Sequence, residues 1–181
     1  MRDRRAHVEG LLLFHRPVDD VERAHKTAML QWLGAGGDVF DRSRTEPGHF
    51  TASAFVVSSD LKEMLLIHHP KLGRWLQPGG HVEPTDPDVV FSARREVAEE
   101  VGLTDIECDG RLFDVDVHPI PGRRDEGPHN HYDLRFLVIS RRREFTVGDG
   151  VREARWVPID DVHKTTDDES VLRAVRRMRL G

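Results

Sequence analysis

The chain has 181 residues, of which 38% are hydrophobic and 33% charged, a composition typical of a globular protein with one domain or one domain plus a small appendage. The formal net charge of −5 argues against nucleic-acid binding as the main activity. One cysteine excludes an intrachain disulfide, and the apolar run at 11–14 is too short for a signal peptide or a membrane span, so we expect a cytoplasmic protein with no membrane partner.

The first 48 residues carry two helical patterns. Helical spacing places Val8, Leu11, Leu12 and His15 on one face. Pro17 ends this first segment, and a second helix begins at Asp19 or Asp20 and stops at the glycines of 34–37. We therefore assign residues 1–48 to an N-terminal helical appendage, which could form a homodimer contact or a lid, and residues 49–181 to the main domain.

The remainder of the chain alternates between strand and helix patterns. Strand-like runs occupy 50–58, 64–69, 111–120, 131–140 and 153–159. The segment 70–87 is rich in loop-forming residues, and 121–128 forms a hairpin-like connection. Asp86 and Pro87 predict the start of a helix that stops at Gly102, and Thr166 with Glu169 predicts a capping box for a terminal helix. The fold class is α/β (α+β), a mixed sheet between helices.

The stretch "RREVAEEVGL" at 94–103 places three acids together. Glu96, Glu99 and Glu100 fall on one helical face, where each like-charge pair costs about 0.2–0.5 kcal/mol. Several hard oxygens on one side, next to the turn at Gly79 and Gly80, suit Mg²⁺ bound through carboxylates, water and substrate phosphate. Arg95 lies four residues before Glu99 and can orient that carboxylate. The pattern therefore predicts a divalent-metal site.

These residues resemble the Nudix box. The family pattern is Gly, five residues, Glu, seven residues, Arg-Glu-apolar-any-Glu-Glu-any-Gly-apolar. Gly80 matches its first glycine, and its second half is matched by Arg95, Glu96, Val97, Glu99, Glu100, Gly102 and Leu103. The chain departs from the pattern twice, because Asp86 stands in place of the first Glu and eight residues separate it from Arg95. The departure puts the role of Asp86 in question, whereas the metal-binding end is intact.

The resemblance implies that residues 49–181 form a Nudix-like catalytic domain, an α/β/α sandwich that hydrolyses a diphosphate linkage with Mg²⁺ or Mn²⁺. By carry-over, the metal ligands are Glu96, Glu99 and Glu100, with the Gly80 carbonyl as an extra ligand and Arg95 holding the carboxylates. Glu83 lies close enough to the turn to be a further ligand. The box does not say which carboxylate takes the proton of the attacking water. Glu99, Glu100 and the downstream acids Glu144 and Glu153 are candidates, each downstream acid also having a simple surface interpretation.

Several residues outside the box are candidates for substrate binding. If 129–136 is a strand, His131, Asp133 and Arg135 share a face that is either a pocket wall contacting phosphate or an exposed sheet face. His81 follows Gly80 and should lie at the pocket mouth. Trp75 either stacks on a base or braces the loop that precedes the glycines.

The substrate is the least determined feature. In the ADP-ribose branch of the family a proline follows the box by about sixteen residues, and Pro119 stands sixteen positions after Leu103. We therefore expect a small phosphorylated substrate, a nucleoside diphosphate derivative. Two alternatives are a non-enzymatic ligand-binding or sensor module on the same scaffold and an isomerase of isopentenyl diphosphate. The sensor commonly lacks box carboxylates, and the isomerase needs a cysteine before the box, whereas Cys108 follows it.

Overall fold

The computed structural model describes residues 3–70, 72–122 and 127–180 and contains one eight-stranded mixed sheet. The strands are β1 (Gly48–Ser58), β2 (Glu63–His69), β3 (Arg74–Leu76), β4 (Gly79–His81), β5 (Ile106–Glu107), β6 (Leu112–Ile120), β7 (His129–Ser140) and β8 (Glu153–Pro158). β1 and β7 pair in parallel along their length at the centre, and every other pairing is antiparallel. β4 pairs with β1, β6 with β7, and β8 with β2.

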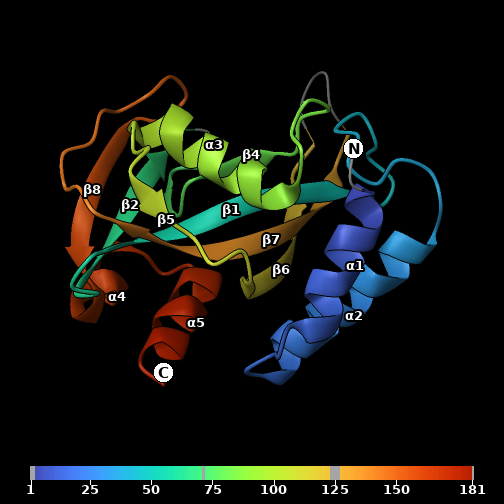
Figure 1. Cartoon of the computed structure of the whole chain (residues 1–181), viewed down its shortest axis with the longest axis horizontal. Helices are drawn as coiled ribbons and strands as arrows, with labels where there is room; N and C mark the ends of the chain where they lie inside the picture. The colour runs from blue at the N-terminus through green and yellow to red at the C-terminus, as the bar shows by residue number, and fades with distance from the viewer. Residues whose placement is uncertain (1–2, 71, 123–126, 181) are drawn as a thin grey trace.

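Helices cover both faces of this sheet. Figure 1 shows α3 (Val89–Val101) on one side, and α4 (Val162–Thr165) and α5 (Glu169–Met178) on the other. Side chains alternate along β1, so Phe50, Ala52 and Ala54 enter the core on the α3 side, whereas Phe55 packs with Val171 and Val175 of α5. The predicted α/β/α sandwich is confirmed. None of the helices in the described ranges has both the length and the apolar character needed to cross a bilayer.

Three local predictions were wrong. Asp88, not Asp86, caps α3 by accepting the Phe91 amide, and Asp168, not Thr166, caps α5. The predicted loop 70–87 contains the short strands β3 and β4, which pair with β2 and β1. Both strands are three residues long, so no alternating pattern could reveal them. Of the predicted connection 121–128, residues 123–126 lie outside the described part of the chain.

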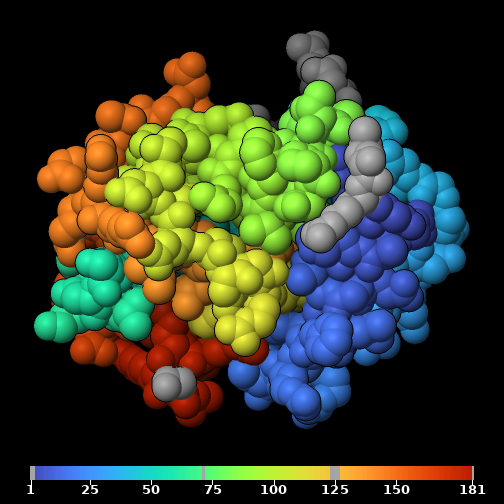
Figure 2. Space-filling model, viewed as in Figure 1, coloured from blue at the N-terminus to red at the C-terminus, as the bar shows by residue number. Residues whose placement is uncertain are grey.

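The N-terminal helices share the core of the sheet. Besides α1 (Arg4–Phe14), this segment forms α2 (Asp20–Gly34), which Asp19 caps. Val8, Leu12, Met29 and Trp32 join the same apolar cluster as Phe50 and Tyr132. In Figure 2 the blue N-terminal helices lie directly against the yellow segment near residue 110. The proposed division of the chain at residue 48 stays a prediction.

A buried ion pair ties these helices to the end of the chain. Glu22 of α2 is fully buried and accepts hydrogen bonds from the His15 ring, 2.6 Å, and the Val18 amide, 2.6 Å. Arg177 of α5 donates to both Glu22 carboxylate oxygens at 3.1 and 3.2 Å. Elements at opposite ends of the sequence are therefore joined around one carboxylate.

A second buried network joins α5 to the centre of the sheet. Arg173 donates to Asp114 at 2.7 and 2.8 Å and to Asp116 at 3.0 Å. Arg135 of β7 lies 3.3 Å from Asp114 and 3.2 Å from Asp116 and donates to Asp133 at 2.7 Å. All five side chains are at most 8% exposed, so each charge depends on its partners for stabilisation.

We predict that Arg173→Met lowers the free energy of unfolding by about 3–5 kcal/mol, because Asp114 and Asp116 lose a buried counter-charge. Urea denaturation of the variant and the wild type measures this difference. The matched control is Arg176→Met on the same helix, which removes only an exposed ion pair with Glu169 and should cost less than about 1 kcal/mol. Equal losses in the two variants would contradict the importance of the buried network.

Candidate active site

The site begins where the β4 backbone meets α3. Gly79 donates its amide hydrogen to Glu100 Oε2 at 3.0 Å. Gly80 faces Glu96. A Cβ added at position 80 would lie 2.6 Å from Glu96 Oε1. Any side chain at position 80 would therefore displace that carboxylate. The two glycines let β4 approach α3 closely enough to bring Glu96 and Glu100 together at the turn.

Arg95 connects the turn, the helix and the acids. Its guanidinium donates to Glu96 Oε1 at 2.8 Å, to Glu99 Oε2 at 3.0 Å and to the His81 carbonyl oxygen at 2.8 Å. Burial by itself would lower the pKa of Arg95, but the hydrogen bonds to Asp86 and Glu96 raise it, so the side chain stays charged. A planar cation with several N–H groups can hold carboxylates and a carbonyl at once.

Asp86 completes this arrangement instead of capping the helix. It accepts from Arg95 at 3.0 to 3.3 Å, from the Ser92 hydroxyl at 2.8 Å and from the Glu83 amide at 3.0 Å. Although burial opposes it, hydrogen bonds from Arg95 and Ser92 hold the pKa of Asp86 below its usual value. The shorter acid and the extra residue of the box still place a carboxylate on Arg95, because Asp88, two residues later, caps the helix and leaves the Asp86 side chain to bind Arg95.

The electrostatics of the two half-buried acids, Glu96 and Glu100, fit a cation. Burial raises the pKa of Glu100 to about 8, and the charges of Glu96 and Glu99 act in the same direction. Burial also raises the pKa of Glu96, against the hydrogen bond from Arg95. Two carboxylates are thus held together where their charged forms are costly, and hard oxygen donors of this kind match Mg²⁺ or Mn²⁺. The residues present fit such an ion.

Glu99 occupies a different position from the other two acids. Its side chain is 58% exposed, whereas that of Glu96 is 13% exposed. Behind it, the segment 146–148 covers the end of α3, with Thr146 donating to the Val101 carbonyl and Gly148 to the Glu100 carbonyl. A Cβ at Gly148 would lie 1.9 Å from the Glu99 carbonyl oxygen, so this close contact requires glycine. The sequence analysis did not identify Gly148.

The N-terminal segment also contacts the box. Arg4 of α1 donates to the carbonyl oxygens of Glu83 at 3.2 Å, Pro84 at 3.3 Å and Asp86 at 2.5 Å. The turn that carries Glu83 is therefore held from two sides, by Arg4 and by the side chain of Asp86. The structure uses the backbone of Glu83 in this way, and its role as a metal ligand stays a prediction.

The downstream acids lie on other elements. Glu153 begins β8, where it pairs with His68 of β2 and lies 3.8 Å from Arg155. Glu144 is exposed in the connection that precedes β8. Neither side chain has a recorded hydrogen bond or ion pair to Arg95 or the box acids within the described residues. The assignment of either acid as general base stays a prediction.

Asp133 and Arg135 lie inside the molecule instead of lining an open pocket. Asp133 accepts from the Ser53 hydroxyl at 2.7 Å and the Thr51 hydroxyl at 3.0 Å, and from Arg135. Both residues are less than 5% exposed. Their polar atoms stabilise the network with Asp114, Asp116 and Arg173, three residues that the sequence analysis missed. The alternating acids in "FDVDV" were the available signal, since a buried strand face rarely carries charge without partners.

Trp75 and His81 take separate positions. Trp75 of β3 has the Arg155 guanidinium 3.8 Å from its ring centre and the His68 ring 5.3 Å away, and its role in substrate binding stays a prediction. His81 closes β4, with its carbonyl on Arg95 and its ring 5.1 Å from the ring of His49 and 5.5 Å from that of His131. His81 and His131 are thus brought together, away from Trp75.

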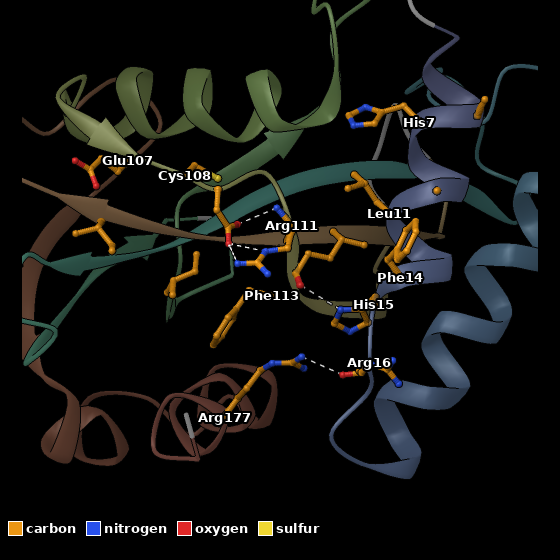
Figure 3. A pocket seen from close by; sticks show the side chains of 16 residues that line it. His7, Leu11, Phe14, His15, Arg16, Glu107, Cys108, Arg111, Phe113 and Arg177 are labelled. Atoms are coloured by element: carbon orange, nitrogen blue, oxygen red, sulfur yellow. Dashed lines mark hydrogen bonds and ion pairs between the residues drawn. The ribbon is translucent and has the colours of Figure 1, made fainter.

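A hollow of about 1040 Å³ lies apart from the box, between α1, the β5–β6 segment and α5. Figure 3 shows Leu11 and Phe14 of α1 on one side of it, with Phe113 and Arg177 on the other. Phe14 is 89% exposed. No residue of the box lines this hollow.

Comparison with known proteins agrees with the geometry. The family model of the NUDIX domain matches residues 48–178. No curated protein sequence matches the chain.

Similar solved structures share the fold. A NUDIX-family hydrolase from Clostridium perfringens is 23% identical, with a TM-score of 0.55 over 73% of this chain and 97% of that one. An Ap4A hydrolase from C. elegans is 18% identical, with a TM-score of 0.57 over 72% and 95%. The NUDIX domain of Shewanella oneidensis NrtR, solved with ADP ribose, is 17% identical, with a TM-score of 0.54 over 83% and 97%. The chain belongs to the NUDIX family, because the family model matches residues 48–178 and the box residues are arranged as described above.

Proposed function

We propose that the protein is a metal-dependent pyrophosphohydrolase that cleaves a diphosphate linkage in a nucleoside diphosphate derivative. The observation that carries the proposal is the pair of half-buried acids, Glu96 and Glu100, held at the glycine turn of β4. Such a pair is unfavourable without a cation, because burial raises both pKa values. A module that only binds a ligand has no need to maintain the whole acidic set.

Each box residue has a distinct task in this proposal. Glu96 and Glu100 hold Mg²⁺ or Mn²⁺, with the Gly80 carbonyl as a further ligand, and Glu99 is the exposed acid that faces solvent and substrate. When bound, the ion neutralises phosphate oxygens and lowers the pKa of a water. Arg95 fixes the directions of Glu96 and Glu99. A carboxylate accepts the proton of the attacking water, for which Glu99, Glu100 and Glu153 are the candidates.

The substrate class is supported by two observations. The similar NUDIX domain of NrtR was solved with ADP ribose, and the similar protein of C. elegans is an Ap4A hydrolase. Pro119 lies within β6, opposite Asn130 of β7, so it is a strand residue and not part of a loop.

The isomerase alternative needs a reactive cysteine. Burial raises the pKa of the Cys108 thiol, which disfavours the reactive thiolate. A cytoplasmic location and a homodimer formed through residues 1–48 stay predictions.

Divalent metal should stabilise the fold. Mg²⁺ at ten times its dissociation constant stabilises the native state by about 1.4 kcal/mol, which raises the melting temperature by about 3–6 °C for a chain of this size. Differential scanning calorimetry of chelator-treated protein, with and without MgCl₂, measures the shift. NaCl at matched ionic strength is the control, and an equal shift with both salts would contradict a specific site.

Glu100→Gln should remove catalysis without unfolding the protein. Glutamine can still accept the Gly79 amide hydrogen, while the buried charge is lost, so the melting temperature without metal should not fall. We expect kcat to fall at least about 100-fold. Loss of a residue that only hydrogen-bonds to a metal ligand costs about 10–100-fold, and loss of a ligand itself should cost more. Steady-state kinetics and the MgCl₂-induced melting shift are measured together. Glu9→Gln, an exposed acid on α1, is the matched control and should retain both. Wild-type turnover in Glu100→Gln would refute the assignment.

The substrate itself is tested with a panel of nucleoside diphosphate derivatives and dinucleoside polyphosphates, coupled to a phosphatase. We expect metal-dependent phosphate release from one compound class, abolished by chelator. Binding of a panel compound by calorimetry without hydrolysis would instead favour the ligand-binding module.

A further inference from the structure

A cluster of histidines lies at one end of the sheet, next to but distinct from the acidic site. His49, His129 and His131 each offer a ring nitrogen, and these atoms lie within 4.8 Å of one another. Their ring centres are 4.9 Å apart for His49 and His129, 5.0 Å for His49 and His131, and 5.2 Å for His129 and His131. His81 and His118 extend the cluster, at 5.5 and 5.6 Å from His131.

The sheet topology assembles this cluster from four strands. His49 of β1 pairs with His131 of β7, and His131 pairs with His118 of β6. His81 of β4 pairs with Thr51, two residues after His49 and therefore on the same face of β1. Histidines that are up to 82 positions apart in the chain thus form one row across adjacent strands, with His129 beside them.

Hydrogen bonds orient these rings in the manner of metal ligands. His49 Nδ1 donates to the Arg44 carbonyl oxygen at 3.1 Å, and His129 Nδ1 donates to the Gly127 carbonyl oxygen at 2.9 Å. Carbonyl oxygens only accept, so each ring donates from Nδ1. His118 Nδ1 lies 2.9 Å from Asp116 Oδ2, the carboxylate–histidine arrangement that accompanies many metal ligands.

His131 is the central ring of the cluster. The ring of His131 lies within 5.0 to 5.6 Å of the rings of four other histidines: His49, His81, His118 and His129. Clustered neutral imidazoles are donors for zinc and related transition metals, whereas Mg²⁺ prefers carboxylate oxygens.

We propose that His49, His129 and His131, with His81 as the fourth donor, form a zinc-binding site separate from the carboxylate site of the box. Tetrahedral ligands at 2.0–2.1 Å from Zn²⁺ are about 3.3 Å from one another, so the ring nitrogens of His49, His129 and His131 must each move by less than about 1 Å. Rotation of the imidazoles about their side-chain bonds supplies a movement of this size.

The sheet separates the two sites. Position 80 faces Glu96 on the α3 side, so the next residue, His81, directs its ring to the opposite face. Zinc bound to His81 would therefore fix the strand that carries Gly80 without occupying the oxygen site. The inference does not depend on the proposed hydrolase activity, because metal binding is measured directly.

The first experiment is a titration of chelator-treated, dialysed protein with Zn²⁺, and with Co²⁺ as a spectroscopic probe, in excess Mg²⁺ to fill the carboxylate site. We expect one Zn²⁺ per chain and the visible absorption bands of tetrahedral Co²⁺. X-ray absorption of the zinc-loaded wild type should show imidazole nitrogens at about 2.0–2.1 Å. No zinc binding, or coordination by oxygen alone, would overturn the proposal.

Matched variants identify the ligands. His131→Asn and His129→Gln should each weaken zinc binding at least about 100-fold, more than the loss of an outer-shell partner. His163→Asn, an exposed histidine on α4, should bind as the wild type does. Wild-type affinity in folded His131→Asn and His129→Gln, checked by circular dichroism, would refute the assignment. If neither variant folds, the wild-type X-ray absorption spectrum decides.

Discussion

The hydrogen bonds of Arg95 are the interaction on which the acidic site depends. One guanidinium holds Asp86 at the turn, Glu96 and Glu99 on α3, and the carbonyl of His81 at the end of β4. The acids repel one another, and burial adds to the cost of their charge, so without this cation the turn and the helix would separate. Gly80 allows the approach, and Arg95 makes it stable.

The same sheet presents different donors on its two sides. On the α3 side, Glu96 and Glu100 meet the glycine turn and offer hard oxygens. On the opposite side, the histidines of β1, β4 and β7 offer nitrogens, and beyond them Arg135, Asp133 and Arg173 fill the interior under α5. The period of two along a strand makes this separation possible, because adjacent residues point to opposite faces.

The N-terminal helices belong to this arrangement through specific polar contacts as well as apolar packing. Arg4 holds the backbone of the box turn, and Glu22 receives His15 from one side and Arg177 of α5 from the other. Residues from both ends of the chain therefore restrain the central domain. The contacts of Arg4 and Arg177 have no local sequence signature, because they join residues 82 and 155 positions apart in the chain.

The sequence by itself determined the major strands and the acidic face of the box, because helical spacing and strand alternation are local properties. It also determined the helices α1, α2, α3 and α5, apart from the capping residues of α3 and α5. It also identified Arg95 as the partner of the acids, since four residues separate it from Glu99. Only the tertiary structure decided that Asp86 binds Arg95 while Asp88 caps α3, and that Asp133 and Arg135 are buried with Arg173. The meeting of His49, His81 and His131 likewise depends on the parallel pairing of β1 with β7, a contact between segments about 80 residues apart that no local pattern encodes.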